Sequence, residues 1–155
     1  FTNLPAFISK LKAYGADAVT LFNRFYEPDI NIENETVGAA SVFSMPTDLR
    51  TTLRWTGILA GKDPLLQISA STGVHSGEAV VKLLLAGATT VQVCSEMYES
   101  GISSLAVMNR FLSSWMVDKS YQTIEDFRRK LSYAEVDNAS RYERAQFMKY
   151  FSSRE

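Results

Sequence analysis

The sequence predicts an α/β fold in which strands alternate with helices and run parallel to one another. The stretch over residues 67–95 reads as strand, small-residue turn, helix, glycine stop and strand. In addition, Gly15 and Gly87 are each followed by Ala, two further residues and Val, where a helix gives way to a strand. This recurrence favours a parallel sheet with right-handed crossovers.

The first elements are a short helix and a strand. The helix is expected over residues 2–14, with a Thr or Asn cap at its start and Gly15 as its stop. Residues 18–22 are apolar and β-favouring, which predicts a buried strand. Asn23 and Arg24 follow at its carboxyl end, where α/β folds keep their chemistry.

No period holds over residues 25–46, so an irregular functional loop or lid is expected there, with a short strand at 37–43 as an alternative. A helix is expected from Thr47, with Gly61 as its stop. Residues 65–69 form the strand that follows.

The turn over residues 70–73 carries no bulky side chain, so its backbone N–H groups can approach an anion closely. It leads into a helix over 76–86 that offers further free N–H groups, followed by a strand over 90–93. In α/β barrels a phosphate commonly lies between the loops after the last two strands, which would place Cys94 and Ser95 opposite this turn. A tight turn that binds nothing is the alternative.

The carboxyl-terminal part is expected to be helical. A short turn precedes the first helix, and the expected segments are the turn at 96–101 and helices at 102–119, 123–131 and 138–151. We expect residues 1–155 to form a single domain, with residues 120–155 as a helical extension within it.

Composition excludes several classes of protein. A chain of 155 residues with 46% hydrophobic composition can bury a core as one domain. The net charge of −1 argues against a nucleic-acid surface. One Cys and one His give neither a disulfide framework nor a recognisable metal cluster, so no metal is expected. With no signal peptide and no membrane span in view, we expect a cytoplasmic location, and the start at Phe1 indicates the middle of a longer protein.

About three strand–helix units can be counted, whereas a closed eight-stranded barrel takes about 250 residues. The sequence therefore predicts a partial (half) TIM (β/α)8 barrel with parallel strands and additional C-terminal helices. Such a sheet has two open edges, which invite pairing, so a homo-oligomer is expected.

Five motifs together resemble a known family. They are residues 21–29 (LFNRFYEPD), 71–74 (STGV), 77–88 (GEAVVKLLLAGA), 91–93 (VQV) and 121–131 (YQTIEDFRRKL). Their order and spacing resemble the carboxyl-terminal half of dihydroorotate dehydrogenase, in its soluble class and its dihydroorotate dehydrogenase-like relatives.

The resemblance implies an FMN oxidoreductase of pyrimidine biosynthesis on a (β/α)8 barrel. Such an enzyme oxidises dihydroorotate to orotate by hydride transfer to the flavin N5, after a base removes a proton from C5. The implied cofactor-binding residues are Thr72 and Gly73, which fall where the family's paired glycines hold the FMN phosphate, and Cys94 and Ser95, which fall where a second pair completes that site.

The implied substrate-binding residues are Asn23, on the family's pyrimidine-contacting Asn, and Arg24, where the family has a small hydroxyl residue. Arg24 would place a cation near the carboxylate of dihydroorotate or an analogue. The family's base and flavin-contacting lysine lie upstream of the residue matching Phe1, so no catalytic residue is expected in this chain, which alone would be inactive.

The sequence departs from the family at Thr72 and Cys94, each of which replaces a glycine, and at Ala40-Ser41, which replaces a glycine pair. From the residues alone, Cys94 is expected to be a small buried hydrophobe and His75 to help cap its helix. An alternative to the enzyme hypothesis is an isolated half-barrel without flavin, which self-associates through its open sheet edges.

Overall fold

The fold is built around a parallel sheet of three strands in a computed structural model that describes residues 3–143. The strands are β1 (Ala18–Leu21), β4 (Gln67–Ala70) and β5 (Thr90–Val91), in the order β1-β4-β5. In the register, Leu21 lies opposite Ala70, and Ala70 lies opposite Val91. The predicted α/β fold with parallel strands is confirmed.

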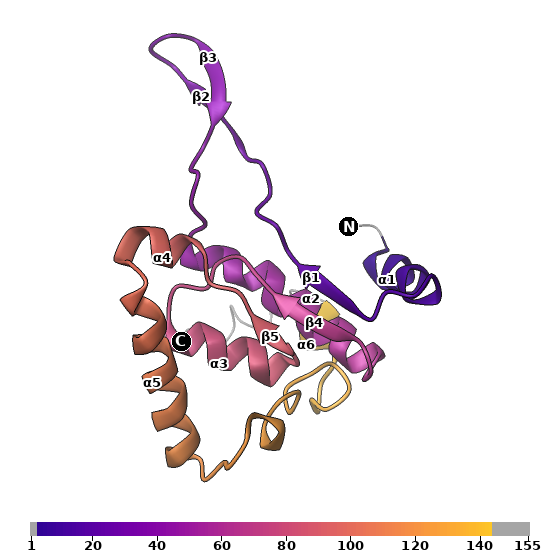
Figure 1. Cartoon of the computed structure of the whole chain (residues 1–155). Helices are drawn as coiled ribbons and strands as arrows, with labels where there is room; N and C mark the ends of the chain where they lie inside the picture. Colours follow the sequence, from indigo (N-terminus) through magenta and orange to yellow (C-terminus); the bar gives the residue numbers. More distant parts are fainter. Residues whose placement is uncertain (1–2, 144–155) are drawn as a thin grey trace, which may run out of the picture.

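Two helices make the crossovers between these strands. α2 (Leu49–Lys62) lies between β1 and β4 in the chain, and α3 (Gly77–Ala86) between β4 and β5. The two helices pack against each other, and each also contacts the sheet (Figure 1). Ile68 and Ala70 of β4 are 0% exposed in this packing. The central strand therefore anchors the core.

The opposite face of the sheet is open within the described part of the chain. Gln67 of β4 is exposed and Ser69 is half-buried, while Ala18 and Thr20 of β1 are both exposed. Leu21 is buried and Val19 packs partly buried against the core, so the predicted first strand is buried on one face only. The open face explains the exposure of Ala18 and Thr20, because they lie opposite Gln67 and Ser69 there.

The predicted helix boundaries at α1 and α3 are confirmed by their capping contacts. α1 (Leu4–Ala13) begins at Asn3, whose Oδ1 accepts a hydrogen bond from Ala6 N at 3.3 Å. α3 begins at Ser76, whose Oγ accepts from Ala79 N at 3.2 Å, and it ends at Gly87 with φ of 119°. Side chains from α1, β1, α2 and β4 form one apolar cluster: Leu4, Ile8, Leu21, Phe22, Leu59, Ala60, Leu66 and Ile68.

The region predicted to be irregular contains an antiparallel hairpin, whose second strand overlaps the short strand allowed at 37–43 as the alternative. Its strands are β2 (Pro28–Asn31) and β3 (Thr36–Ala39), which project from the rest of the molecule on two long connections (Figure 1). Asn31 Oδ1 accepts hydrogen bonds from the backbone N–H groups of Glu33 and Asn34 and so stabilises the turn. Every residue of both strands is exposed, so the sequence carries no alternation of apolar and polar residues that predicts a hairpin here.

Gly61 does not end its helix, contrary to the prediction. A short 3₁₀ helix, η1 (Pro46–Asp48), leads into α2, which continues through Gly61 to Lys62. A Cβ atom built on Gly61 would lie 2.6 Å from the backbone nitrogen of Ala134. The glycine therefore serves the close approach of the carboxyl-terminal segment to α2.

The region after β5 is only partly as predicted. α4 (Ser95–Ser100) replaces the predicted turn, and α5 (Ser103–Asp118) matches the predicted long helix. The predicted helix over 123–131 is wrong, because only η2 (Ile124–Asp126) forms there. α6 (Ser140–Glu143) matches the start of the predicted tail helix, whose remainder lies outside the described residues.

Backbone hydrogen bonds explain why residues 123–131 do not form a helix. Arg129 N donates to Leu84 O at 3.0 Å, and Leu131 N donates to Leu85 O at 2.9 Å. These donors are thereby committed to the end of α3 and cannot form a helix ladder of their own. Phe127 is 0% exposed and packs edge-on against Trp115, with ring centroids 5.0 Å apart.

Among the described residues, no helix is long and apolar enough to cross a membrane.

We predict that Gly61→Ala lowers the free energy of unfolding by about 1–3 kcal/mol, because the new methyl group overpacks against the backbone of Ala134. Helix propensity alone predicts the opposite sign, a gain of roughly 1 kcal/mol. Urea unfolding measures the difference. Gly38→Ala is the matched control, since nothing lies within 4 Å of its added Cβ, and we expect a change within about 0.5 kcal/mol. Stabilisation by Gly61→Ala would contradict this account.

Candidate functional site

The carboxyl ends of the three parallel strands meet at one cavity of about 600 Å³. Parallel strands that end at the same edge of a sheet bring their following loops together, and this edge is where α/β folds bind ligands. All six residues predicted to bind cofactor or substrate line this cavity: Asn23, Arg24, Thr72, Gly73, Cys94 and Ser95. The structure thus brings the predicted residues together, and their roles remain predictions.

The segment after β1 contributes Asn23 and Arg24. The Asn23 Oδ1 atom accepts a hydrogen bond from Arg24 N at 2.9 Å. The Arg24 guanidinium pairs loosely with Glu27, at 3.5 Å. Its Nε atom is buried and has no hydrogen-bond partner among the residues that the structure describes. A buried guanidinium N–H that lacks a partner favours binding of a ligand that brings a hydrogen-bond acceptor.

The turn after β4 has an unusual backbone. Thr72 and Gly73 both have positive φ, 81° and 78°. The Thr72 hydroxyl donates to Phe22 O at 2.7 Å, which holds the turn against the segment that follows β1. A Cβ atom on Gly73 would lie 2.2 Å from the backbone nitrogen of Leu49, so the turn can approach the start of α2 only with glycine at this position.

The segment after β5 contributes Cys94 and Ser95. Cys94 is exposed, so the prediction that it is a small buried hydrophobe is wrong. It lies beyond the end of the short strand β5, on the cavity wall. Ser95 is buried and begins α4. Its hydroxyl oxygen accepts a hydrogen bond from Ser44 N at 2.9 Å.

Ser44 is the central residue that sequence reasoning missed. Its Oγ donates to Ser95 Oγ at 2.9 Å, accepts from Gly73 N at 3.2 Å, and lies 3.3 Å from His75 Nε2. It is 8% exposed and lines the cavity. It falls in the region predicted to be irregular, and the only local signal was its position just before the Met45-Pro46 helix start.

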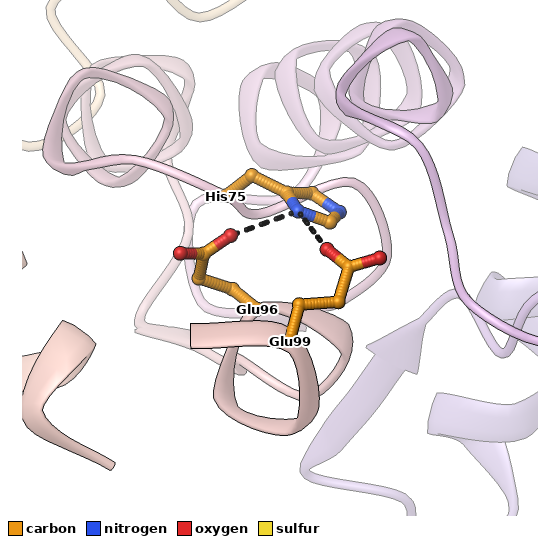
Figure 2. Close-up of side chains that lie close together, drawn as sticks. All are labelled: His75, Glu96 and Glu99. Carbon is orange, nitrogen blue, oxygen red and sulfur yellow. Dashed lines mark hydrogen bonds and ion pairs between the residues drawn. The ribbon is translucent and has the colours of Figure 1, made fainter. Parts of the chain in front are cut away.

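His75 does not cap α3, because Ser76 does so. Its ring instead lies between two carboxylates of α4 (Figure 2). The Nδ1 atom is 3.2 Å from Glu96 Oε2 and 3.6 Å from Glu99 Oε2. Sequence reasoning missed this cluster because it looked for metal ligands among Cys and His only, and the two glutamates are more than 20 residues further along the chain.

The fold and the cavity together define the class of protein. It is an α/β unit whose candidate ligand site lies at the carboxyl ends of parallel strands, beside a tight turn of small residues. No family model matches the chain.

Curated relatives are similar to the chain over part of their length. It is 37% identical over 71 residues to probable dihydroorotate dehydrogenase A (fumarate) of Streptococcus pneumoniae, covering 46% of this chain and 23% of the relative. It is 32% identical over 112 residues to dihydroorotate dehydrogenase (fumarate) of Lachancea kluyveri, covering 66% and 35%. It is 30% identical over 135 residues to putative dihydroorotate dehydrogenase A (fumarate) of Streptococcus agalactiae, covering 75% of this chain and 43% of the relative.

A solved structure shares the fold. The crystal structure of a ligand-free DHODH from Eimeria tenella superposes with a TM-score of 0.64 at 18% identity, covering 80% of this chain and 35% of that one. The resemblance to dihydroorotate dehydrogenase is therefore confirmed by sequence and by fold. The chain matches 23% to 43% of the length of the three curated relatives.

We predict that Ser44→Ala lowers the free energy of unfolding by about 1–3 kcal/mol, because it leaves the buried Gly73 N–H without its acceptor and removes the hydroxyl that donates to Ser95 Oγ. Thermal or urea unfolding measures the loss. Ser41→Ala is the control, since that hydroxyl is exposed and donates to the nearby Phe43 carbonyl. Equal effects of the two substitutions would show that the Ser44 contacts contribute nothing.

Proposed function

We propose that this chain is the carboxyl-terminal part of an FMN-dependent oxidoreductase resembling dihydroorotate dehydrogenase, acting in cytoplasmic pyrimidine biosynthesis. The observation that carries the proposal is the meeting of three strand ends at one cavity, on a chain similar to proteins of that name. In this proposal the chain contributes the phosphate end of the flavin site and one side of the substrate site.

The open face of the sheet supports a partial barrel. Parallel sheets are normally covered on both faces, yet α2 and α3 cover only one face here. The other face carries polar side chains, and Gln92 Nε2 donates to Ser69 Oγ at 2.9 Å. Inward-pointing side chains of a (β/α)8 barrel occupy such a face. We infer that further strands close the barrel in the intact protein.

The residues around the cavity fit an anionic group. Small residues line one side of the cavity, and Arg24 brings a guanidinium charge to its wall. Among the described residues, Arg24 Nε has no hydrogen-bond partner. Thr72, Gly73, Cys94 and Ser95 would hold the FMN phosphate, with the Ser95 hydroxyl and backbone N–H groups as donors, except the Gly73 N–H, which already donates to Ser44 Oγ. FMN, when bound, supplies the hydride acceptor.

Arg24 and Asn23 would hold the substrate, which we propose to be dihydroorotate or an analogue. A guanidinium is a planar fork that matches a carboxylate, and an amide can pair with the edge of a pyrimidine ring. Because the implied base belongs to the family's amino-terminal half, the role of these two residues is to orient the substrate and to neutralise its charge.

We predict that the purified chain binds FMN at least tenfold more tightly than riboflavin, which lacks the phosphate. A single charge-assisted hydrogen bond to a phosphate is worth about 1.5–3 kcal/mol, which corresponds to a factor of ten or more. Quenching of flavin fluorescence measures both dissociation constants. Cys94→Asp places a negative charge on the cavity wall and should remove this preference for FMN.

Tyr14→Asp is the matched control, because it adds the same charge at a side chain that is 93% exposed and does not line the cavity. It should leave the preference for FMN intact. Equal affinity of the unmodified chain for FMN and riboflavin, or no affinity for either, would overturn the proposed phosphate site.

The open sheet edges favour a second candidate, in which the chain is a self-associating half-barrel that binds no flavin. β1 and β5 each have one unpaired side within the described sheet. We predict a species of at least twice the 17.3 kDa chain mass in light scattering coupled to size exclusion. Thr20→Pro, which removes a backbone donor from β1, should shift it toward the monomer. A monomer at all concentrations would refute this candidate.

A further inference from the structure

We propose that His75, Glu96 and Glu99 form a binding site for a divalent transition-metal ion, with Zn²⁺ as the best match to its ligands. The three side chains converge from two elements, as Figure 2 shows. His75 belongs to the turn before α3, while both glutamates belong to α4. Their spacing of three residues places the two carboxylates on one face of that helix.

The distances fit tetrahedral coordination. Zinc binds imidazole nitrogen and carboxylate oxygen at about 2.0–2.2 Å, so two such ligands of one tetrahedral ion lie about 3.4 Å apart. The His75 Nδ1 atom is 3.2 Å from Glu96 Oε2 and 3.6 Å from Glu99 Oε2. All three ligand atoms lie within 4.8 Å of one another. Only a small movement of Glu99, whose side chain is 47% exposed, is needed to complete the set.

The hydrogen count at Nδ1 also favours a cation. Two carboxylate oxygens face this one nitrogen, which carries at most one hydrogen in any state of the ring. Nδ1 can therefore donate its hydrogen to one of the two carboxylates at most, and the other carboxylate faces the nitrogen without a hydrogen bond. The His75 side chain is only 10% exposed and that of Glu96 only 18%, so water screens this arrangement poorly. A dication that replaces the hydrogen would satisfy all three groups.

The surroundings supply what such a site requires. The second ring nitrogen, Nε2, lies 3.3 Å from Ser44 Oγ, which can accept its hydrogen while donating to Ser95 Oγ. The tautomer with its hydrogen on Nε2 can donate to this hydroxyl and leaves Nδ1 free to bind metal. A cavity of about 430 Å³ borders His75 and Glu96, with Ser100, Ser103 and Ser104 also on its wall. It offers room for a water molecule in the fourth coordination position.

Zn²⁺ is preferred to Mg²⁺ on the chemistry of the donors. Imidazole suits zinc and other transition metals, whereas Mg²⁺ demands six near-octahedral oxygen ligands. The site lies beside the cavity proposed for FMN, and Ser44 contacts both. Zinc binding is measured without flavin, so its failure is distinguishable from failure of the proposed flavin site.

The test is titration of the chelator-treated, untagged chain with Zn²⁺, followed by isothermal calorimetry. We expect one ion per chain, with a dissociation constant in the micromolar range or below, and no competition from millimolar Mg²⁺. Glu99→Gln keeps the size of an exposed side chain, so it should fold normally, and it should weaken Zn²⁺ binding at least tenfold. His75→Gln should abolish binding.

Two control variants separate this site from other zinc ligands. Glu78→Gln alters another carboxylate at the same cavity that is not within the ligand cluster, and it should retain the affinity. Cys94→Ser removes the single thiol of the chain and should retain it as well. Absence of stoichiometric Zn²⁺ binding overturns the proposal, as does binding that survives both Glu99→Gln and His75→Gln, or binding that Cys94→Ser abolishes.

Discussion

The pairing of β4 with a parallel strand on each side is the constraint on which the rest of this structure depends. Ile68 and Ala70 are fully buried against the helices, and Ala70 lies opposite both Leu21 and Val91 at the end of the sheet. Because the three strands end at one level, the segments that follow them must meet there. The candidate site is a consequence of this register, and a shift along β4 would separate its parts.

Hydrogen bonds to Ser44 then hold the converging segments in place. The hairpin of β2 and β3 projects away from the body (Figure 1). The chain that returns from it places Ser44 against Gly73 and Ser95. One hydroxyl thereby joins the connection before α2, the turn after β4 and the start of α4. His75 extends this network to the carboxylates of α4, so the proposed flavin and metal sites are physically adjacent.

The carboxyl-terminal segment shows how sequence rules can mislead where a second segment approaches. Glycine usually stops a helix, but Gly57 and Gly61 both lie inside α2. A Cβ on Gly57 would lie 2.3 Å from the Tyr142 ring, and one on Gly61 would meet Ala134. These glycines allow the later segment to pack directly on the helix. Local propensity is a weak prior that tertiary contacts override.

The sequence by itself determined the features that depend on neighbouring residues: a Thr or Asn cap for α1, the Ser76 cap, the Gly87 stop, the alternation of strands and helices, and the tight turn at Thr72-Gly73. These follow from interactions within a few residues. Tertiary structure alone decided the pairing of β2 with β3, the burial of Ser44 and the convergence of Glu96 and Glu99 on His75. Each of these depends on contacts between sequence-distant groups, or on the absence of a covered face, and neither leaves a periodic signal in the chain.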